Sequence, residues 1–252
     1  MLTGIVIAQN EEESIQSSLK TLLFCDEVLV IDNNSSDRTK NLVYDMGVRV
    51  ITDKTQGDFS YLRNFAAKEA KGEWLLYIDA DEKVSHDLRA NIKHELEQPR
   101  ADAYYLRRRD HFMGKVLEHG EVAKVYERGI IRLMKKGRGV WRGSIHEEWK
   151  TDTSISSIDG FIEHYPHPTV QQFIEHVNRY SQIRAQELYN AGQHTNILQI
   201  IGYPVAKFVY TYFLKGGIKD GAAGFIYSFL MSFHSFLVRS TLCIKRASDE
   251  NK

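Results

Sequence analysis

The sequence has 252 residues, with 33 Lys and Arg against 33 Asp and Glu and a hydrophobic share of 42%. This length and hydrophobicity allow one large folded domain or two small ones, and they argue against an intrinsically disordered chain. A formal net charge of zero argues against a dedicated nucleic-acid-binding protein, which needs a surplus of Lys and Arg to contact phosphates.

Short apolar runs alternate with segments of helical periodicity through the first hundred residues. Strands are predicted at four of these runs, 4–8, 28–31, 48–51 and 74–78. Apolar residues at helical spacing predict helices between them, over 15–22, 42–46 and 62–66. We expect Ser35 or Ser36 to cap the second helix and Asp58 or Ser60 the third. The alternation predicts an α/β fold, with a mostly parallel sheet and helices on both faces.

The N-terminus and the cysteines indicate the compartment. The first residues read as a strand, without the basic segment, apolar run and cleavage site of a signal peptide. Cys25 and Cys243 are too far apart in sequence for a metal knuckle, and two thiols in a chain of this size are typical of a reducing compartment. The sequence therefore predicts a cytoplasmic protein.

Polar residues gather where the predicted strands end. Asn10 and Glu11 follow the first strand, 32–35 follows the second, and Asp79 and Asp81 follow the fourth. Ligands of parallel sheets bind at these strand ends, so the pattern predicts an acidic site there. The first turn lacks the glycines that a dinucleotide-binding fold requires.

Asp79 and Asp81 form an Asp-x-Asp pair directly after an apolar strand. Chance alone gives about one such pair in a chain of this composition, so the preceding strand is what favours ligand binding over a solvated loop before the helix predicted at 88–96. A phosphate ligand in an acidic site needs a divalent cation, and oxygen ligands suit Mg²⁺ or Mn²⁺. We expect one carboxylate to bind the metal and the other the sugar hydroxyls of a nucleotide.

The last third of the chain is predicted to be helical. Thr169 and Gln172 form a capping box, and Gly192 ends the apolar periodicity that follows. Two apolar stretches, 197–214 and 222–238, come next, in a region with six basic residues and one acidic residue between 196 and 246. Apolar helices with Lys and Arg at their edges predict association with an anionic membrane surface. The alternative is a buried helical hairpin that covers the core.

Four segments of the first 95 residues resemble inverting glycosyltransferases of family 2, whose nucleotide-sugar fold is called GT-A. These segments are 5–12, 28–39, 61–66 and 71–81. The resemblance implies that six residues surround the nucleotide sugar: Ala8, Asn10 and Glu11 at the base and ribose, Asp32 and Arg63 at the base, and Asp79 at the ribose. It also implies that Asp81 binds the metal on the diphosphate, most often of a UDP-sugar.

The second half resembles a subgroup that includes lipopolysaccharide core β-1,4-glucosyltransferases, through 112–115, 131–133 and 140–147. The acceptors of that subgroup tend to be lipid-linked glycans, which agrees with the membrane association expected from the C-terminal region. The Glu-Asp pair that bears the catalytic base in many family members is absent from this chain.

The nearest equivalent of that pair is the run of residues 146–148, and Glu147 is our candidate for the base. Glu148 and Asp110 are the alternates, and the structural alternative for Glu147 is a salt bridge to Arg142 or Lys150. Three histidines are candidates to complete the metal shell: His146, His164 and His167. His164 is the preferred one.

We therefore expect a catalytic domain over 1–168, with a nucleotide-binding half at 1–98 and an acceptor-binding half at 99–168. A helical region on the membrane surface over 169–246 and a tail at 247–252 follow. The expected activity is metal-dependent inverting transfer of a sugar from a nucleotide diphosphate sugar to a hydroxyl of a glycan or lipid-linked glycan, in lipopolysaccharide core or cell-envelope biosynthesis.

Three other readings are weighed against this one. A catalytically silent nucleotide-sugar-binding or membrane scaffold protein would share the same residues. A nucleotidyltransferase would need a Gly-rich loop with Lys or Arg after the first strand, which is missing. A receiver-like signalling domain would fill only about 120 residues and leave the C-terminal half unexplained.

Overall fold

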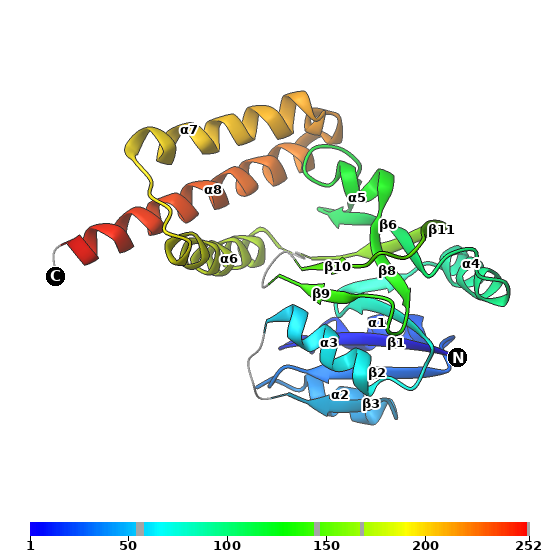
Figure 1. The fold of residues 1–252 in the computed structure, drawn as a ribbon. Helices are drawn as coiled ribbons and strands as arrows, with labels where there is room; N and C mark the ends of the chain where they lie inside the picture. Colours follow the sequence, from blue (N-terminus) through cyan, green and yellow to red (C-terminus); the bar gives the residue numbers. More distant parts are fainter. Residues whose placement is uncertain (54–57, 144–146, 167–168, 251–252) are drawn as a thin grey trace. The chain divides into compact units, whose positions relative to one another are not determined.

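The computed structural model describes residues 1–53, 58–143, 147–166 and 169–250 (Figure 1). The chain forms two compact units. The first contains Met1–Arg109 and Val125–His164, and the second contains Asp110–Lys124 and Tyr165–Lys252. Residues 110–124 thus group with the C-terminal helices, although they lie within the sequence of the expected acceptor-binding half.

The first unit is built on a mixed sheet with the strand order β3-β2-β1-β4-β8-β6-β11-β5. The first four strands of this order are parallel, and the pairs β4–β8, β6–β8 and β11–β5 are antiparallel. The strands are β1 (Leu2–Ala8), β2 (Glu27–Asp32), β3 (Arg49–Thr52), β4 (Trp74–Asp79), β5 (Glu82–Val84), β6 (Ala103–Phe112), β8 (Ile130–Lys135) and β11 (Ile155–His164). The predicted parallel sheet is confirmed for β1 to β4, and the later strands turn it into a mixed sheet.

Helices cover both faces of this sheet, as predicted. One apolar core joins the sheet to α1 (Ile15–Leu22), α2 (Thr39–Asp45) and α4 (His86–Glu97). The core on the other face contains Leu62 and Ala66 of α3 (Phe59–Glu69). It also contains the tryptophans of a small hairpin, β9 (Val140–Arg142) and β10 (Glu148–Lys150), so that Trp141 and Trp149 are buried. A short helix, α5 (Ala123–Arg128), precedes β8.

Of the two helix caps predicted in the first hundred residues, one is confirmed and the other is wrong. The carboxylate of Asp58 accepts a hydrogen bond from the backbone N–H of Tyr61, which caps α3. At α2 the N-cap is Arg38 and neither Ser35 nor Ser36 caps the helix. Both serines instead form hydrogen bonds to Asn10, 25 or 26 residues earlier in the chain, so a long-range contact replaces the expected local one.

The end of α4 carries an ionic cluster around the buried Glu95 that makes stability depend on pH. Glu95 accepts hydrogen bonds from Arg100 Nη2 at 2.6 Å and from the Tyr104 hydroxyl at 2.8 Å. The bond from Arg100 outweighs the cost of burial and, with that from Tyr104, lowers the pKa of Glu95 from 4.5 to about 2. Ionised Glu95 therefore stabilises the fold fully above about pH 4.5, and this contribution is lost as the pH falls through 2.

We predict that Glu95→Gln lowers the free energy of unfolding by about 2 kcal/mol at pH 7. The difference between the two proteins should shrink to about half when the pH falls from 7 to 3, because the unfolded wild-type chain then binds a proton that the folded one does not. Urea unfolding of both proteins at each pH measures this. A difference that stays constant with pH would mean that shape and neutral hydrogen bonding, not charge, stabilise the cluster.

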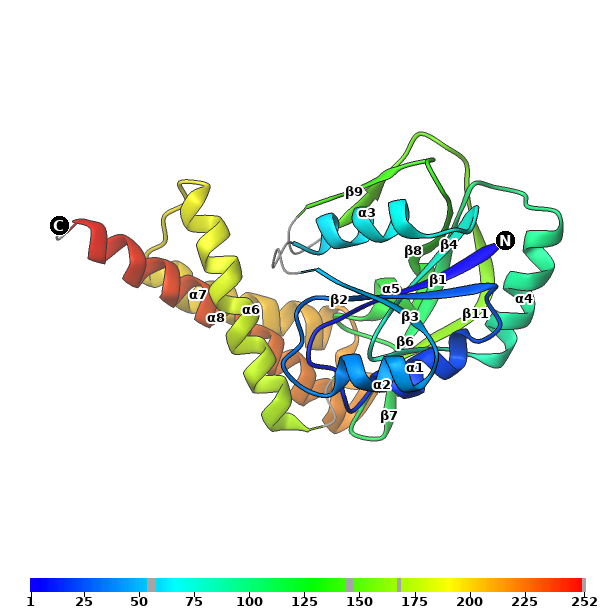
Figure 2. The same ribbon diagram turned by 90° about the horizontal axis from the view of Figure 1, so that it is seen from below.

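The second unit is mainly helical (Figures 1 and 2). Its helices are α6 (Val170–Asn190), α7 (Ile197–Phe208), a π-helical turn (Val209–Leu214), a 3₁₀ turn (Gly217–Asp220) and α8 (Gly221–Glu250). The short strand β7 (Lys115–Leu117) pairs with the last residues of β6. The predicted cap of α6 is confirmed, because the Thr169 hydroxyl accepts from the N–H of Gln172. Helix α8 packs against both α6 and α7.

Candidate active site

The ends of β1 and β2 are fastened together by hydrogen bonds between their loops. Ala8 pairs in register with Asp32, and the Ala8 carbonyl accepts from the N–H of Asn33 at 2.8 Å. Asn10 adopts the left-handed conformation (φ 58°), so its N–H reaches the Ser35 hydroxyl at 3.0 Å. The structure thus brings together Ala8, Asn10 and Asp32 at one edge of the sheet.

Glu11 lies beside the acidic residues that follow β4. Its N–H donates to the Thr39 hydroxyl, and its carboxylate accepts from the Ser14 hydroxyl at 2.6 Å. Burial raises the pKa of the Glu11 carboxyl to about 7, although the bond from Ser14 opposes it, and the charges of Asp81 and Asp79 raise it further. This electrostatic coupling places Glu11 in the same acidic cluster as the Asp-x-Asp pair.

Beside Asp32, buried oxygen atoms lack protein partners. The Asp32 side chain is buried, and Asp32 pairs in register with Thr52 of β3. Among the described residues, Asn33 Oδ1 and Thr52 Oγ1 are buried without a hydrogen-bond partner. Buried polar atoms are normally satisfied, so such atoms at a strand end point to a ligand or to ordered water.

Asp79 is held by two buried arginines. Arg132 Nη2 lies 2.5 Å from Asp79 Oδ2, Arg132 Nη1 lies 3.2 Å from Oδ1, and Arg63 Nη2 lies 3.1 Å from Oδ1. Burial alone would raise the pKa of Asp79, but Arg132 and then Arg63 override this effect and hold it well below its ordinary value. The carboxylate is therefore ionised and fixed in orientation.

Glu82 stabilises the Asp-x-Asp turn through hydrogen bonds made in the protein interior. Its fully buried carboxylate accepts from Arg132 at 3.2 Å, from Arg108 at 3.3 Å and from the N–H of Asp79 at 2.9 Å. Neither Arg132 nor Glu82 was among the predicted site residues. The available signal was a single arginine inside the apolar run 130–134, because a charge in a buried strand needs a partner.

Arg63 also links Asp79 to Glu147. Arg63 Nη2 lies 2.8 Å from Glu147 Oε1, and the guanidinium carbon lies 4.7 Å from the centre of the Trp141 ring. The structural alternative for Glu147, a salt bridge to Arg142 or Lys150, is not what the structure shows. Lys150 contacts Glu148 instead, whose side chain is 68% exposed compared with 14% for Glu147. Asp110 is buried and belongs to the second unit.

Asp81 faces His164 at the end of β11. Asp81 Oδ2 lies 3.3 Å from His164 Nε2. Burial would raise the pKa of Asp81, but the neighbouring His164 holds it below its ordinary value. His146 and His167 lie outside the described residues.

These two side chains fit the ligands of a substrate-bridged cation. Within the described ranges there is no group of three or more His, Cys, Asp or Glu side chains that could hold a metal ion. Mg²⁺ and Mn²⁺ commonly use one or two protein ligands and complete their shell with water and phosphate oxygens. A partly buried carboxylate beside one imidazole suits that mode and does not suit a closed, all-protein metal site.

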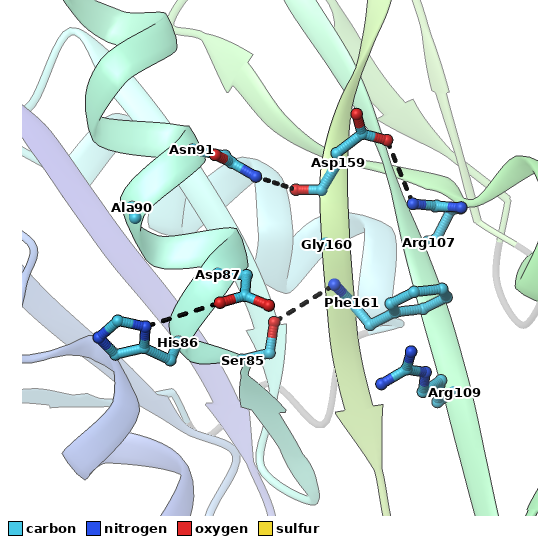
Figure 3. A pocket seen from close by; sticks show the side chains of 10 residues that line it. All are labelled: Ser85, His86, Asp87, Ala90, Asn91, Arg107, Arg109, Asp159, Gly160 and Phe161. Atoms are coloured by element: carbon cyan, nitrogen blue, oxygen red, sulfur yellow. Dashed lines mark hydrogen bonds and ion pairs between the residues drawn. The ribbon is translucent and has the colours of Figure 1, made fainter.

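A cavity of about 530 Å³ lies between the start of α4 and the strands β6 and β11 (Figure 3). Arg107 and Arg109 stack on the ring of Phe161, at 4.5 and 3.7 Å from its centre. Asp87 and Asp159 also line the cavity, so its two positive and two negative charges balance. None of these residues belongs to the acidic network, and they take no part in the function proposed below.

Comparison with known proteins gives the family. The model of the family described as Glycosyl transferase family 2 matches residues 3–151, more than half of the chain. The lipopolysaccharide core biosynthesis glycosyltransferase LpsC of Rhizobium meliloti is 25% identical over 98% of this chain and 93% of its own length. An uncharacterized glycosyltransferase of Rickettsia bellii is 22% identical over 94% of this chain and 84% of its own length.

Two solved structures share the fold. TarS 1–349 of S. aureus, in complex with UDP-GlcNAc, aligns with a TM-score of 0.54 and 15% identity over 98% of this chain and 92% of that one. The mannosyltransferase PcManGT of Pyrobaculum calidifontis, in complex with GDP-Man and Mn²⁺, aligns with a TM-score of 0.58 and 15% identity over 96% and 86% of the chains. These likenesses confirm the predicted GT-A fold and a helical C-terminal region after it.

Proposed function

The chain belongs to glycosyl transferase family 2, and from this we propose that it is a metal-dependent inverting enzyme of lipopolysaccharide core or cell-envelope biosynthesis. It transfers a sugar from a nucleotide diphosphate sugar to a hydroxyl of a glycan or lipid-linked glycan. The observation that carries the proposal is the network at the end of β4, where Asp79 is fixed by two arginines and Asp81 stands beside His164.

The proposed donor site lies across the ends of β1, β2 and β4. It uses six residues that the resemblance implied: Ala8, Asn10, Glu11, Asp32, Arg63 and Asp79. The buried acceptor atoms of Asn33 and Thr52 beside Asp32 support a base in this place, because ring N–H groups of a nucleobase would satisfy them. UDP is the first candidate for the nucleotide, since TarS is solved with UDP-GlcNAc, and GDP is the second, since PcManGT is solved with GDP-Man.

Asp81 and His164 are the proposed metal ligands. The cation, Mg²⁺ or Mn²⁺, would stabilise negative charge on the departing diphosphate. The Mn²⁺ in the PcManGT complex supports this choice of ion. In this proposal the neighbouring His164 keeps Asp81 ionised. Arg63 and Arg132 form ion pairs with Asp79, so that Asp81 is the carboxylate that binds the cation.

Glu147 is the proposed catalytic base. In inverting transfer, the acceptor oxygen attacks the anomeric carbon while the bond from that carbon to the diphosphate oxygen breaks, and the acceptor proton passes to a base. Glu147 has the chemistry for this step, because it is a shielded carboxylate held by Arg63, which also holds Asp79 at the donor site. A single placed carboxylate is sufficient for inversion.

The acceptor half is proposed to be residues 99–168, and the C-terminal region from 169 to 246 is proposed to hold the protein on the cytoplasmic membrane surface. LpsC supports a lipid-linked acceptor, since it is a lipopolysaccharide core glycosyltransferase and aligns over nearly the whole chain. Two helical segments, Ile197–Leu214 and Gly217–Asp249, are long and apolar enough to meet a bilayer.

We predict that the purified protein binds one of UDP, GDP or dTDP at micromolar concentration with Mn²⁺ and much more weakly with EDTA. Isothermal titration with each nucleotide in both buffers measures this. Binding with no turnover on any sugar nucleotide would favour the catalytically silent scaffold. Absence of binding to all three nucleotides would contradict the proposed donor site.

A further inference from the structure

Helix α7 and the π-helical turn after it present an uncovered apolar face. Its members recur every three or four residues along the segment and are all exposed: Leu198, Ile201, Val205, Val209 and Phe213. Helix α7 packs on α8, and in the π-helical turn that follows α7 Thr211 is buried. Only 6% of the segment from Ile197 to Leu214 is buried in the protein, so this apolar face must meet a membrane or a partner.

The charges around this face favour a lipid surface. Between 196 and 246 the chain has six basic residues and one acidic residue. The acidic residue is Asp220. Its carboxylate Oδ1 lies 2.8 Å from His119 Nδ1, so it already has a partner within the protein. Arg239 of α8 stacks on the ring of Tyr203 in α7, 3.4 Å from its centre. Arginine and tyrosine at the edge of an apolar surface are typical of the level of lipid headgroups, and net positive charge suits anionic lipids.

The end of this segment is tied to residues that cannot cross a membrane with it. Asp220 Oδ2 accepts from the N–H of His119 at 3.0 Å, and Lys207 contacts Glu121 at 3.2 Å. His119 and Glu121 belong to residues 110–124, which are joined through Arg109 and Val125 to the sheet-bearing unit at both ends. A crossing by α7 would therefore have to carry residues 110–124, with both of their chain connections, to the far side of the membrane.

Helix α8 is also held by polar partners over its second half. Lys245 contacts Gln186, Arg246 donates to the carbonyl of Tyr189, and Gln182 contacts Thr241. The polar residues on the outer side of α6 are exposed. Lipid hydrocarbon does not accommodate such groups, so α8 is not surrounded by it.

We propose that residues 197–214 lie in the plane of the membrane, with the face of Leu198, Val205 and Phe213 in the lipid interface, and do not span the bilayer. The segment has the length of a short crossing, about 27 Å for 18 residues. The turn after its C-terminal end is nevertheless tied to residues 110–124 by His119–Asp220, and α6, which precedes its N-terminal end, packs along α8. This inference rests on the membrane association in the proposed function and defines its mode.

Fluorophore depth in vesicles tests this geometry. Single cysteines replace Leu198, Val205 or Phe213 in a C25S/C243S background, are labelled with an environment-sensitive dye, and are mixed with vesicles of 30% anionic lipid. Quenching by lipids labelled at different depths should place all three dyes at the same shallow level, open to a reductant added outside. In a spanning helix, the dye at 205 would lie about 10 Å deeper, and one end would be protected, which would overturn the proposal.

Paired variants test the surface itself. The double substitution L198E/V205E should lower the vesicle-bound fraction at least tenfold, whereas Leu23→Glu, at a leucine in the first unit that is 63% exposed, should not change it. Nucleotide titration of the same proteins should be unchanged, so that a failure of the donor site and a failure of the membrane surface are distinguishable. Normal flotation of the double variant, together with loss of a lipid-free dimer, would assign the face to a second copy of the chain and overturn the proposal.

Discussion

Glu147→Gln is expected to lower kcat by about a hundredfold to ten-thousandfold and to leave nucleotide affinity within about threefold of the wild type. The amide keeps the size of the side chain and an oxygen that can accept from Arg63, but it cannot take the proton of the acceptor hydroxyl. Steady-state transfer assays and calorimetry with the same nucleotide measure the two effects separately.

Glu148→Gln is the matched control, because it makes the same change one residue later on a side chain that is mostly exposed and contacts Lys150. It should retain nearly full turnover. If Glu148→Gln loses turnover and Glu147→Gln does not, the base is Glu148. If Glu147→Gln instead weakens nucleotide binding together with turnover, Glu147 acts by holding Arg63 against Asp79 and is a positioning residue.

The first hundred residues could be predicted well because their information is local. Alternating strands and helices are set by periodicities within a few residues, and parallel strands bring their ends to one edge whatever their exact partners. Asp32 and Ala8 could therefore be placed together without knowledge of their register, which the structure shows. The alternation did not extend past β4, and the antiparallel strands that follow were not foreseen.

The residues that hold the site side chains in position could not be predicted, because they make contacts with residues that are distant in sequence. Arg132 lies 53 residues after Asp79, and Glu147 lies 84 residues after Arg63. No local sequence pattern indicates these pairs. Arg132 reaches Asp79 because the sheet order places β8 beside β4. The cap of α2 failed for the same reason, because Ser35 and Ser36 bind Asn10 and not the helix beside them.

The two C-terminal apolar stretches look alike in sequence and differ in their surroundings. One third of the candidate segment in Gly217–Asp249 is buried by protein, compared with 6% for Ile197–Leu214. Composition cannot separate a helix flanked by neighbours from one that is covered on a single side. The contacts of α8 with α6 separate them, and they come from a part of the chain more than 50 residues away.

Asp81→Ala is expected to abolish the metal dependence of nucleotide binding and to lower turnover at least a hundredfold. Without the carboxylate, the cation keeps only His164 among its proposed ligands, and charge on the leaving diphosphate is less stabilised by several kcal/mol. Binding in Mn²⁺ should then fall to the level seen in EDTA. Titration in both buffers and a transfer assay measure these effects.

Asp45→Ala removes an exposed carboxylate at the end of α2 and serves as the control for charge alone, so it should behave as the wild type. His164→Ala should weaken Mn²⁺ activation less than Asp81→Ala does, because a neutral ligand contributes less to a hard cation than a carboxylate. Asp79 stays engaged by Arg132 and Arg63 in both variants, so residual binding in EDTA should be unchanged. If Asp81→Ala retained full stimulation by Mn²⁺, the cation would have to bind elsewhere, and the role of the Asp-x-Asp pair would reduce to Asp79.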